Sequence, residues 1–98
     1  KAIRKQVKLN FKKGNKSINV YLLIYLPNNK KKSPVFLAYN FEGNHSVNTD
    51  QAILINGKKE SELSGMEFKK FIASGRGGRT SRWAIDKMID SGYGLVTV

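Results

Sequence analysis

The chain has 98 residues, 40% of them hydrophobic, and it contains no cysteine. This length allows one small domain at most, with a core that leaves a thin margin of stability. The lack of cysteine excludes a disulfide framework and a thiolate metal site. No apolar run approaches the ~20 residues that span a bilayer, and the first residues lack the apolar region of a signal peptide.

The formal net charge of +11 requires an explanation. Clustered Lys and Arg can neutralise the phosphates of a nucleic acid. The lysine clusters here, at 12–13, 30–32, 58–59 and 69–70, fall mostly in or beside predicted turns. Loop lysines usually keep a surface solvated, so we expect no nucleic-acid partner. The alternative is a small basic binding module for an anionic polymer, either nucleic acid or a uronic-acid polysaccharide.

The first third of the chain predicts an antiparallel hairpin. Apolar and polar residues alternate over 7–11, and a turn sequence follows at 13–16. A second strand covers 18–26, with its second half expected to be buried on both faces. Pro27 ends this strand, and 30–33 is a charged loop. One face of the second strand carries Ile18, Val20, Leu22, Ile24 and Leu26, and the other carries Tyr21, Leu23 and Tyr25.

The middle of the chain combines one apolar run with irregular segments. Residues 35–39 form a short apolar run between breakers, typical of a strand that is covered on both faces. Residues 40–50 are polar and irregular. Residues 52–55 are either a short strand or an anchor for a loop, and Asn56-Gly57 is a turn.

The last third predicts two helices and a strand. Residues 61–73 form a short helix weakened by Gly65, and 74–79 form a loop. Thr80 or Ser81 is expected to cap a second helix, over 83–89. Gly92 suits the position just after that helix, where φ is usually positive. Residues 95–98 then form another buried strand.

A strand, a loop, a helix and a strand in this order predict a β-α-β crossover. The strands at 35–39 and 95–98 should therefore be parallel. A hairpin followed by this unit places the chain in the α/β class. We expect a single domain portion over 1–98, made of the hairpin and its loop (1–33) and a β-loop-α-β unit (34–98).

Three motifs in order resemble a known family. They are the run V-F-L-A-Y-N-F-E-G-N-H-S-V over 35–47, the pair Arg82-Trp83, and Gly92-Tyr93-Gly94. Together they resemble the N-terminal part of glucuronoyl esterases and of the related acetyl xylan esterases, which are serine hydrolases of the α/β-hydrolase fold. The resemblance implies an N-terminal fragment of such a sheet.

The resemblance also implies a function. The parent protein would hydrolyse a carboxylic ester on plant cell-wall polysaccharide, most specifically the ester between 4-O-methyl-glucuronic acid on xylan and a lignin alcohol. It would need no cofactor and no metal. Its partners would be glucuronoxylan and the remainder of the hydrolase fold, with strand-mediated self-association as another outcome, and no membrane. A bacterial enzyme of this kind would be secreted or periplasmic, with its signal absent from this chain.

The chain lacks a recognisable nucleophile. A serine hydrolase raises its serine on a sharp strand-to-helix turn, usually within G-x-S-x-G. None of the eight serines has that frame, and we interpret Ser81 as a helix cap. In the family the elbow resembles Gly-x-Ser-Arg-x-Gly-Lys and lies beyond the strand that starts near Leu95. We therefore assign no catalytic residue, and we expect the fragment itself to be inactive.

The resemblance points to one loop beside an active site. In α/β-hydrolases the loop after this strand often donates a backbone amide to the oxyanion. The candidate residues here are Asn40, Phe41, Gly43, Asn44 and His45. In glucuronoyl esterases the arginine after the nucleophile is implicated in that role, so the loop would then only brace the site.

Two further candidate functional features are better explained as structural. His45 is the only histidine, so we expect no Ser–His pair and no His-based metal cluster. We interpret it as a loop imidazole bonded to backbone. Arg76-Gly77-Gly78-Arg79 lacks the Walker pattern and does not complete G-x-G-x-x-G, which favours a structural loop. Arg82 and Trp83 are interpreted as structural too, with the indole packing the second helix on the sheet.

Overall fold

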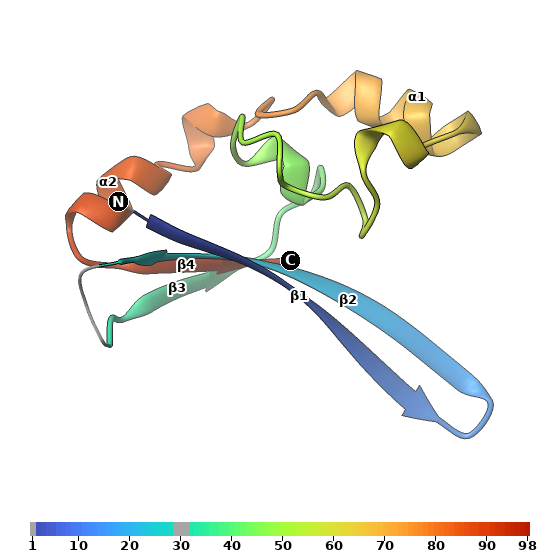
Figure 1. Ribbon diagram of the computed structural model, residues 1–98, viewed down its shortest axis with the longest axis horizontal. Coiled ribbons are helices and arrows are strands. Elements are labelled where there is room, and N and C mark those ends of the chain that lie inside the picture. Colours follow the sequence, from blue (N-terminus) through green and yellow to red (C-terminus); the bar gives the residue numbers. More distant parts are fainter. Residues whose placement is uncertain (1, 29–31) are drawn as a thin grey trace.

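The computed structural model describes residues 2–28 and 32–98 and is built on a mixed four-stranded sheet (Figure 1). The strands run in the order β1-β2-β4-β3. The pairs β1–β2 and β2–β4 are antiparallel, and β3–β4 is parallel. The predicted α/β class is therefore confirmed. The strands are β1 (Ala2–Lys13), β2 (Lys16–Pro27), β3 (Val35–Ala38) and β4 (Gly94–Thr97).

The predicted hairpin is confirmed and is longer than the alternation alone indicated. It starts at Ala2, which pairs with Pro27, and it closes at a turn where Gly14 has a φ of 61°. Its turn end projects away from the rest of the molecule (Figure 1). The charged loop predicted at 30–33 lies partly outside the described residues.

The parallel pair predicted from the crossover is also confirmed. In its register Phe36 lies opposite Leu95, and Ala38 lies opposite Thr97. β4 is inserted between β2 and β3, so the last strand in the chain lies inside the sheet. The carboxyl ends of β3 and β4 consequently lie next to each other.

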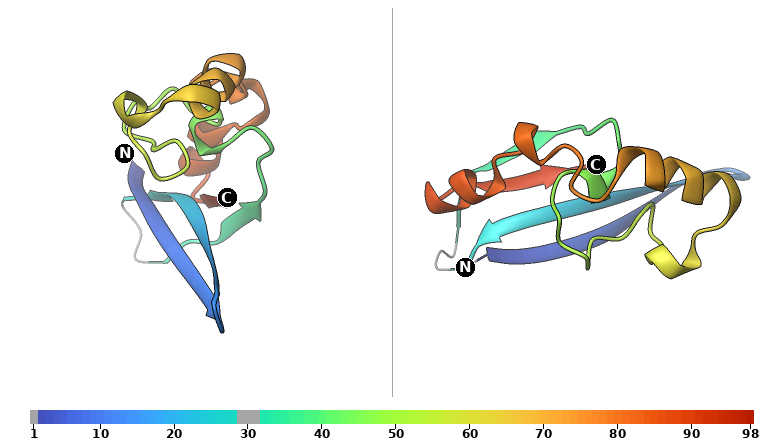
Figure 2. Two further views of the ribbon diagram at one scale, coloured as in Figure 1. Left: turned by 90° about the vertical axis from the view of Figure 1, so that its right-hand side faces the viewer. Right: turned by 90° about the horizontal axis from the view of Figure 1, so that it is seen from above.

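All the helical segments cover the same face of the sheet (Figures 1 and 2). The two α-helices are α1 (Gly65–Ser74) and α2 (Ile85–Asp90). The three short 3-10 turns are η1 (Asn44–Ser46), η2 (Glu60–Glu62) and η3 (Thr80–Arg82). None of the described helices has the length and apolar character that crossing a membrane requires.

The boundaries of both helices differ from the prediction. α1 begins at Gly65 rather than at 61, so this glycine opens the helix instead of interrupting it. The predicted cap at Thr80 or Ser81 is wrong. The chain bends at Trp83 (φ −119°, ψ 85°), which separates η3 from α2 and leaves Ala84 at the cap position. Gly92, with a φ of 87°, follows the helix as predicted.

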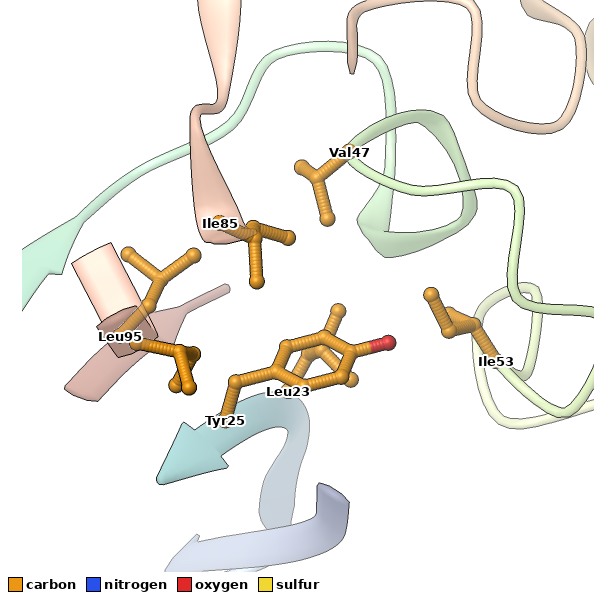
Figure 3. Close-up of a cluster of buried hydrophobic side chains, with 7 residues drawn as sticks. Leu23, Tyr25, Val47, Ile53, Ile85 and Leu95 are labelled. Atoms are coloured by element: carbon orange, nitrogen blue, oxygen red, sulfur yellow. The ribbon is translucent and has the colours of Figure 1, made fainter. Parts of the chain in front are cut away.

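The core lies between the sheet and the helical layer. Residues from β2 and β4 meet residues from the loops and α2 there (Figure 3). Trp83 packs against this cluster, as its helix-packing interpretation required. The segment 52–55 forms no strand beyond an isolated bridge between Ile55 and Lys58, and since Ile53 is 1% exposed, it anchors a loop. The core residues are Leu23, Tyr25, Val47, Ile53, Ile85, Ile89 and Leu95.

The opposite face of the sheet is uncovered by the described residues. The expectation that β3 is covered on both faces is wrong, since Leu37 is 73% exposed and Phe36 is 52% exposed. The second half of β2 buries Leu23 and Tyr25 but leaves Ile24 and Leu26 only half-buried. The reason is that all the helical segments lie on the other side of the sheet and that β3 is an edge strand.

Two glycines with positive φ test how tightly the loops pack on the hairpin. A Cβ on Gly57 (φ 80°) would clash with the Tyr21 ring, lying 2.7 Å from its Cζ, whereas a Cβ on Gly14 (φ 61°) meets nothing within 4 Å. Gly14→Ala should lower the free energy of unfolding by about 1 kcal/mol through backbone strain alone. Gly57→Ala should lower it by about 2–4 kcal/mol, because overpacking is added. Equal losses in urea unfolding would contradict this packing.

Candidate active-site loop

The loop over 40–46 lies at the carboxyl edge of the parallel strands. Asn40 follows the end of β3, and its N–H donates to the carbonyl of Val98 beside it, at 3.0 Å. In open α/β sheets this edge is where ligands bind. A cavity of about 680 Å³ opens here, walled by the loop, the middle of β2 and α1. The candidate residues from the sequence, Asn40, Phe41, Gly43, Asn44 and His45, all line this cavity.

The Asn40 side chain holds the loop against β4. Its Nδ2 donates to Oδ1 of Asn44 at 2.7 Å and to Oγ1 of Thr97 at 3.0 Å. Its Oδ1 accepts from the N–H of Gly43 at 2.9 Å. Asn44 in turn donates from Nδ2 to the carbonyl of Tyr21, at 2.9 Å. One primary amide therefore connects the loop to the end of β4 through both its N–H donors and one of its two acceptor directions.

Gly43 is required by a close approach. Its φ is 100°, and a Cβ there would lie 2.7 Å from Cε1 of His45. The carbonyl of Gly43 accepts from both the N–H and the hydroxyl of Ser46, at 3.0 and 2.6 Å. The loop is consequently closed on itself as well as joined to the sheet.

His45 contradicts two expectations from the sequence. Its ring is buried, and Nε2 lies 2.6 Å from Oγ of Ser74 rather than against backbone. A Ser–His pair therefore exists in this chain. The fold creates it by bringing the last turn of α1 onto η1, a contact between residues 29 positions apart that no local pattern reveals.

The geometry of this pair is structural rather than catalytic. The Ser74 hydroxyl also lies 3.0 Å from the carbonyl of Lys70, as expected at a helix end. Nδ1 of His45 is buried and has no hydrogen-bond partner among the described residues, whereas a catalytic base is oriented by a third group. The ring packs on Phe71 with centroids 5.1 Å apart. The pair joins α1 to the loop.

The Arg-Gly segment supports the loop from behind. The N–H of Gly77 donates to the carbonyl of His45, and the N–H of Arg79 donates to that of Ser46, both at 2.8 Å. Nη1 of Arg76 donates to the carbonyls of Asp50 and Ile53, at 3.0 and 2.8 Å. This agrees with the predicted structural loop, but the central position of the Arg76 guanidinium was missed, because the sequence does not show which carbonyls it meets.

A second polar cluster fixes the loop after η1 to the hairpin. Oδ2 of Asp50 accepts from Arg4 at 2.7 Å and from the Tyr25 hydroxyl at 3.0 Å. Burial raises the pKa of Asp50, but hydrogen bonds from Ala52, Arg4 and Tyr25 outweigh it and hold this pKa below its usual value. Burial and the neighbouring carboxylate raise the pKa of Tyr25. The carboxylate therefore stays charged and anchors the loop.

The lining of the cavity carries two acidic residues and one lysine. Both acidic residues that line it are paired: Glu42 with Arg79 at 3.0 Å, and Glu67 with Lys58 at 2.8 Å. Lys70 also lines the cavity and makes no ion pair within the described part of the chain. In residues 2–28 and 32–98 no three His, Asp or Glu side chains are grouped as metal ligands would be.

A mixed sheet with a ligand-sized cavity at the carboxyl edge of its parallel strands is an arrangement that α/β-hydrolases share with other open α/β folds. No family model matches the chain. Among curated proteins, a carbohydrate esterase named MZ0003, from an unknown prokaryotic organism, is 39% identical over 100 residues, which is 99% of this chain and 23% of that protein.

Among solved structures, esterases are again similar to this chain. A CE15 esterase described as promiscuous, from a marine bacterial metagenome, is 38% identical with a TM-score of 0.70, and covers 98% of this chain and 24% of its own. A glucuronoyl esterase from Solibacter usitatus is 33% identical with a TM-score of 0.71 and the same coverage. The resemblance to glucuronoyl esterases is confirmed, and the chain spans about a quarter of the length of these relatives.

The burial of His45 predicts a pH dependence of stability. Burial and the nearby Arg76 lower the pKa of His45 below its ordinary value of 6.5, although Glu42 acts in the opposite direction. The unfolded chain therefore takes up a proton first, and stability that is complete above pH 6.5 falls as the pH drops below that value. In urea unfolding between pH 7.5 and 5, His45→Gln should lose this dependence. An unchanged pH slope in the variant would contradict it.

The Asn40 side chain should contribute far more to stability than an exposed asparagine pair does. Asn40→Ala leaves a Gly43 N–H and a Thr97 hydroxyl without their partner, which should cost about 2–3 kcal/mol. Asn10→Ala removes an exposed bond to Asn19 and should cost less than about 0.5 kcal/mol. Free energies of unfolding from urea titrations compare the two, and similar losses would show that Asn40 does not hold the loop.

Proposed function

We propose that the protein in its full length is a serine hydrolase of carboxylic esters on plant cell-wall polysaccharide, and specifically a glucuronoyl esterase. The observation that carries the proposal is the likeness of almost the whole chain, at 33–38% identity, to solved CE15 and glucuronoyl esterases. The cavity at the carboxyl edge of β3 and β4 supports it, because the loop after β3 in this fold lies beside the reacting serine.

The proposed reaction is serine acyl transfer. A serine hydroxyl supplied from outside the residues described here attacks the ester carbonyl, and a base takes its proton. The resulting tetrahedral oxyanion collapses, the alcohol leaves with that proton, and water hydrolyses the acyl-enzyme to the free uronate. Ser74, although bonded to His45, ends a helix and makes no strand-to-helix turn, so these 98 residues alone are proposed to be inactive.

In this proposal the loop with Asn40, Phe41, Gly43, Asn44 and His45 forms one wall of the active site. Since the Gly43 N–H already binds Asn40, it is not available to an oxyanion. The N–H groups of Phe41 and Glu42 donate no hydrogen bond within the described chain. The N–H groups of Asn44 and His45 also donate no such bond, so an oxyanion would bind among these four amides, and the remaining contacts brace the wall.

The proposed function implies a cellular location for the enzyme and a partner for the uncovered parts of this sheet. Cell-wall glucuronoxylan lies outside the bacterial cell, so the enzyme would be secreted or periplasmic. The bare edge of β3 and the uncovered apolar face of the sheet would pack against the remainder of the hydrolase fold, because an exposed strand edge and a bare apolar face both favour association.

One property favours a second candidate function. The net charge of +11 would also suit a basic module that binds an anionic polymer without hydrolysing it. Tight, salt-sensitive retention of the 98-residue chain on such a polymer, together with an absence of hydrolysis by the protein in its full length, would favour this candidate over the esterase.

The proposal is tested by comparing two esters. The protein in its full length should hydrolyse a methyl ester of 4-O-methyl-glucuronate with a kcat/KM at least about tenfold above that for an acetylated xylo-oligosaccharide. The isolated 98 residues, as the matched control, should hydrolyse neither. Preference for the acetyl ester would contradict the glucuronoyl assignment, and the absence of any ester hydrolysis would contradict the esterase proposal as a whole.

A further inference from the structure

The turn end of the β1–β2 hairpin has two chemically different faces. Side chains alternate along each strand, and directly paired residues share a face. One face carries the exposed apolar residues Leu9, Phe11 and Ile18. The other carries Lys8, Asn10, Lys12, Ser17 and Asn19, all exposed and polar, and we call these five residues the hairpin strip.

The positive charge of the chain is concentrated in this region. The first acidic residue in the sequence is Glu42, whereas ten of the 18 Lys and Arg residues precede it. On the hairpin only Arg4 is paired, with Asp50. The five hairpin lysines, which include Lys8 and Lys12, make no ion pair with any described residue.

The hairpin strip continues the wall of the cavity. Tyr21 and Asn19 line the cavity, Lys8 lies directly opposite Tyr21, and Asn10 lies opposite Asn19. Nδ2 of Asn10 donates to Oδ1 of Asn19 at 2.6 Å, which leaves the other amide oxygen and nitrogen outside that bond. A polar path therefore runs from the cavity along the hairpin to Lys12.

The chemistry of this path suits an anionic polysaccharide. Its amides and hydroxyl match sugar hydroxyls, and its ammonium groups match carboxylates. Lys70, which lines the cavity and makes no ion pair with any described residue, adds one more ammonium group. The hairpin strip offers no exposed ring on which nucleic-acid bases could stack, since Phe11 lies on the opposite face and the ring of Tyr21, at the cavity end, is half-buried against Gly57.

We propose that the hairpin strip is a binding surface for the free uronates of a glucuronoxylan chain that extends out of the cavity. This inference rests on the proposed function for its choice of polymer. It adds a binding surface outside the reacting site. It also gives a role to the positive charge of the hairpin lysines, which do not line the cavity.

The test uses the protein in its full length and two forms of one polymer. The polymers are de-esterified glucuronoxylan and the same xylan after its uronates have been reduced to alcohols. Lys8→Gln/Lys12→Gln removes two charges from the hairpin strip. Lys5→Gln/Lys13→Gln removes the same charge from the opposite face of the same hairpin, and so serves as the matched control.

Affinity electrophoresis at two salt concentrations measures how tightly each double variant binds each xylan. Lys8→Gln/Lys12→Gln should bind glucuronoxylan about fivefold more weakly at low salt, the effect of two exposed ion pairs, and the control should bind like the unchanged protein. The reduced xylan should not distinguish the variants. Equal weakening by both double variants, equal affinity for the two xylans, or tighter binding of an RNA oligomer would overturn the proposal.

The esterase proposal and the hairpin-strip proposal can be refuted independently of each other. Both double variants should hydrolyse the small methyl glucuronate ester at an unchanged rate, because Lys5, Lys8, Lys12 and Lys13 are exposed residues outside the cavity. Hydrolysis without the face-specific loss of binding would refute the hairpin strip alone. Face-specific binding without hydrolysis would refute the esterase and leave the hairpin strip as the site of a binding module.

Discussion

The hydrogen bonds of the Asn40 amide are the constraint on which the site depends. A loop at the end of an edge strand is ordinarily free to move, because only one side of the strand is paired. Here Asn40 bonds to Thr97 and to the loop itself, so the end of β3 is held to β4 and the loop has one shape. The cavity wall follows from this, since the same loop residues line it.

The layer behind this loop shows how a small core is supplemented by paired polar groups that are only partly buried. Arg76 binds two backbone carbonyls of the 50–53 segment, and its guanidinium lies 5.6 Å from the centre of the Phe71 ring. Asp50 binds Arg4 and Tyr25 on the hairpin. These contacts connect loop to loop and loop to sheet, and pairing offsets the cost of taking these polar groups partly out of water.

Local patterns predicted the strands and the order of elements, but not the contacts between them. Period-2 alternation and the apolar runs were enough for the hairpin and for the parallel pair, because the crossover rule fixes that direction. The insertion of β4 beside β2, the bare face of β3 and the bend at Trp83 depend on packing between distant segments. The Ser74–His45 contact was missed for the same reason. The loop at 40–45 was proposed because its motif is contiguous, and its role in a site stays a prediction.

The central claim is that the loop after β3 forms one wall of a serine esterase site. The most direct measurement is a crystal structure of the protein in its full length after reaction with a fluorophosphonate, which bonds covalently to an activated serine. The account predicts a single labelled serine whose phosphonate lies in the cavity, within contact distance of the loop residues 41–45. A phosphonate at the other edge of the sheet, or the absence of any labelled serine, would contradict it.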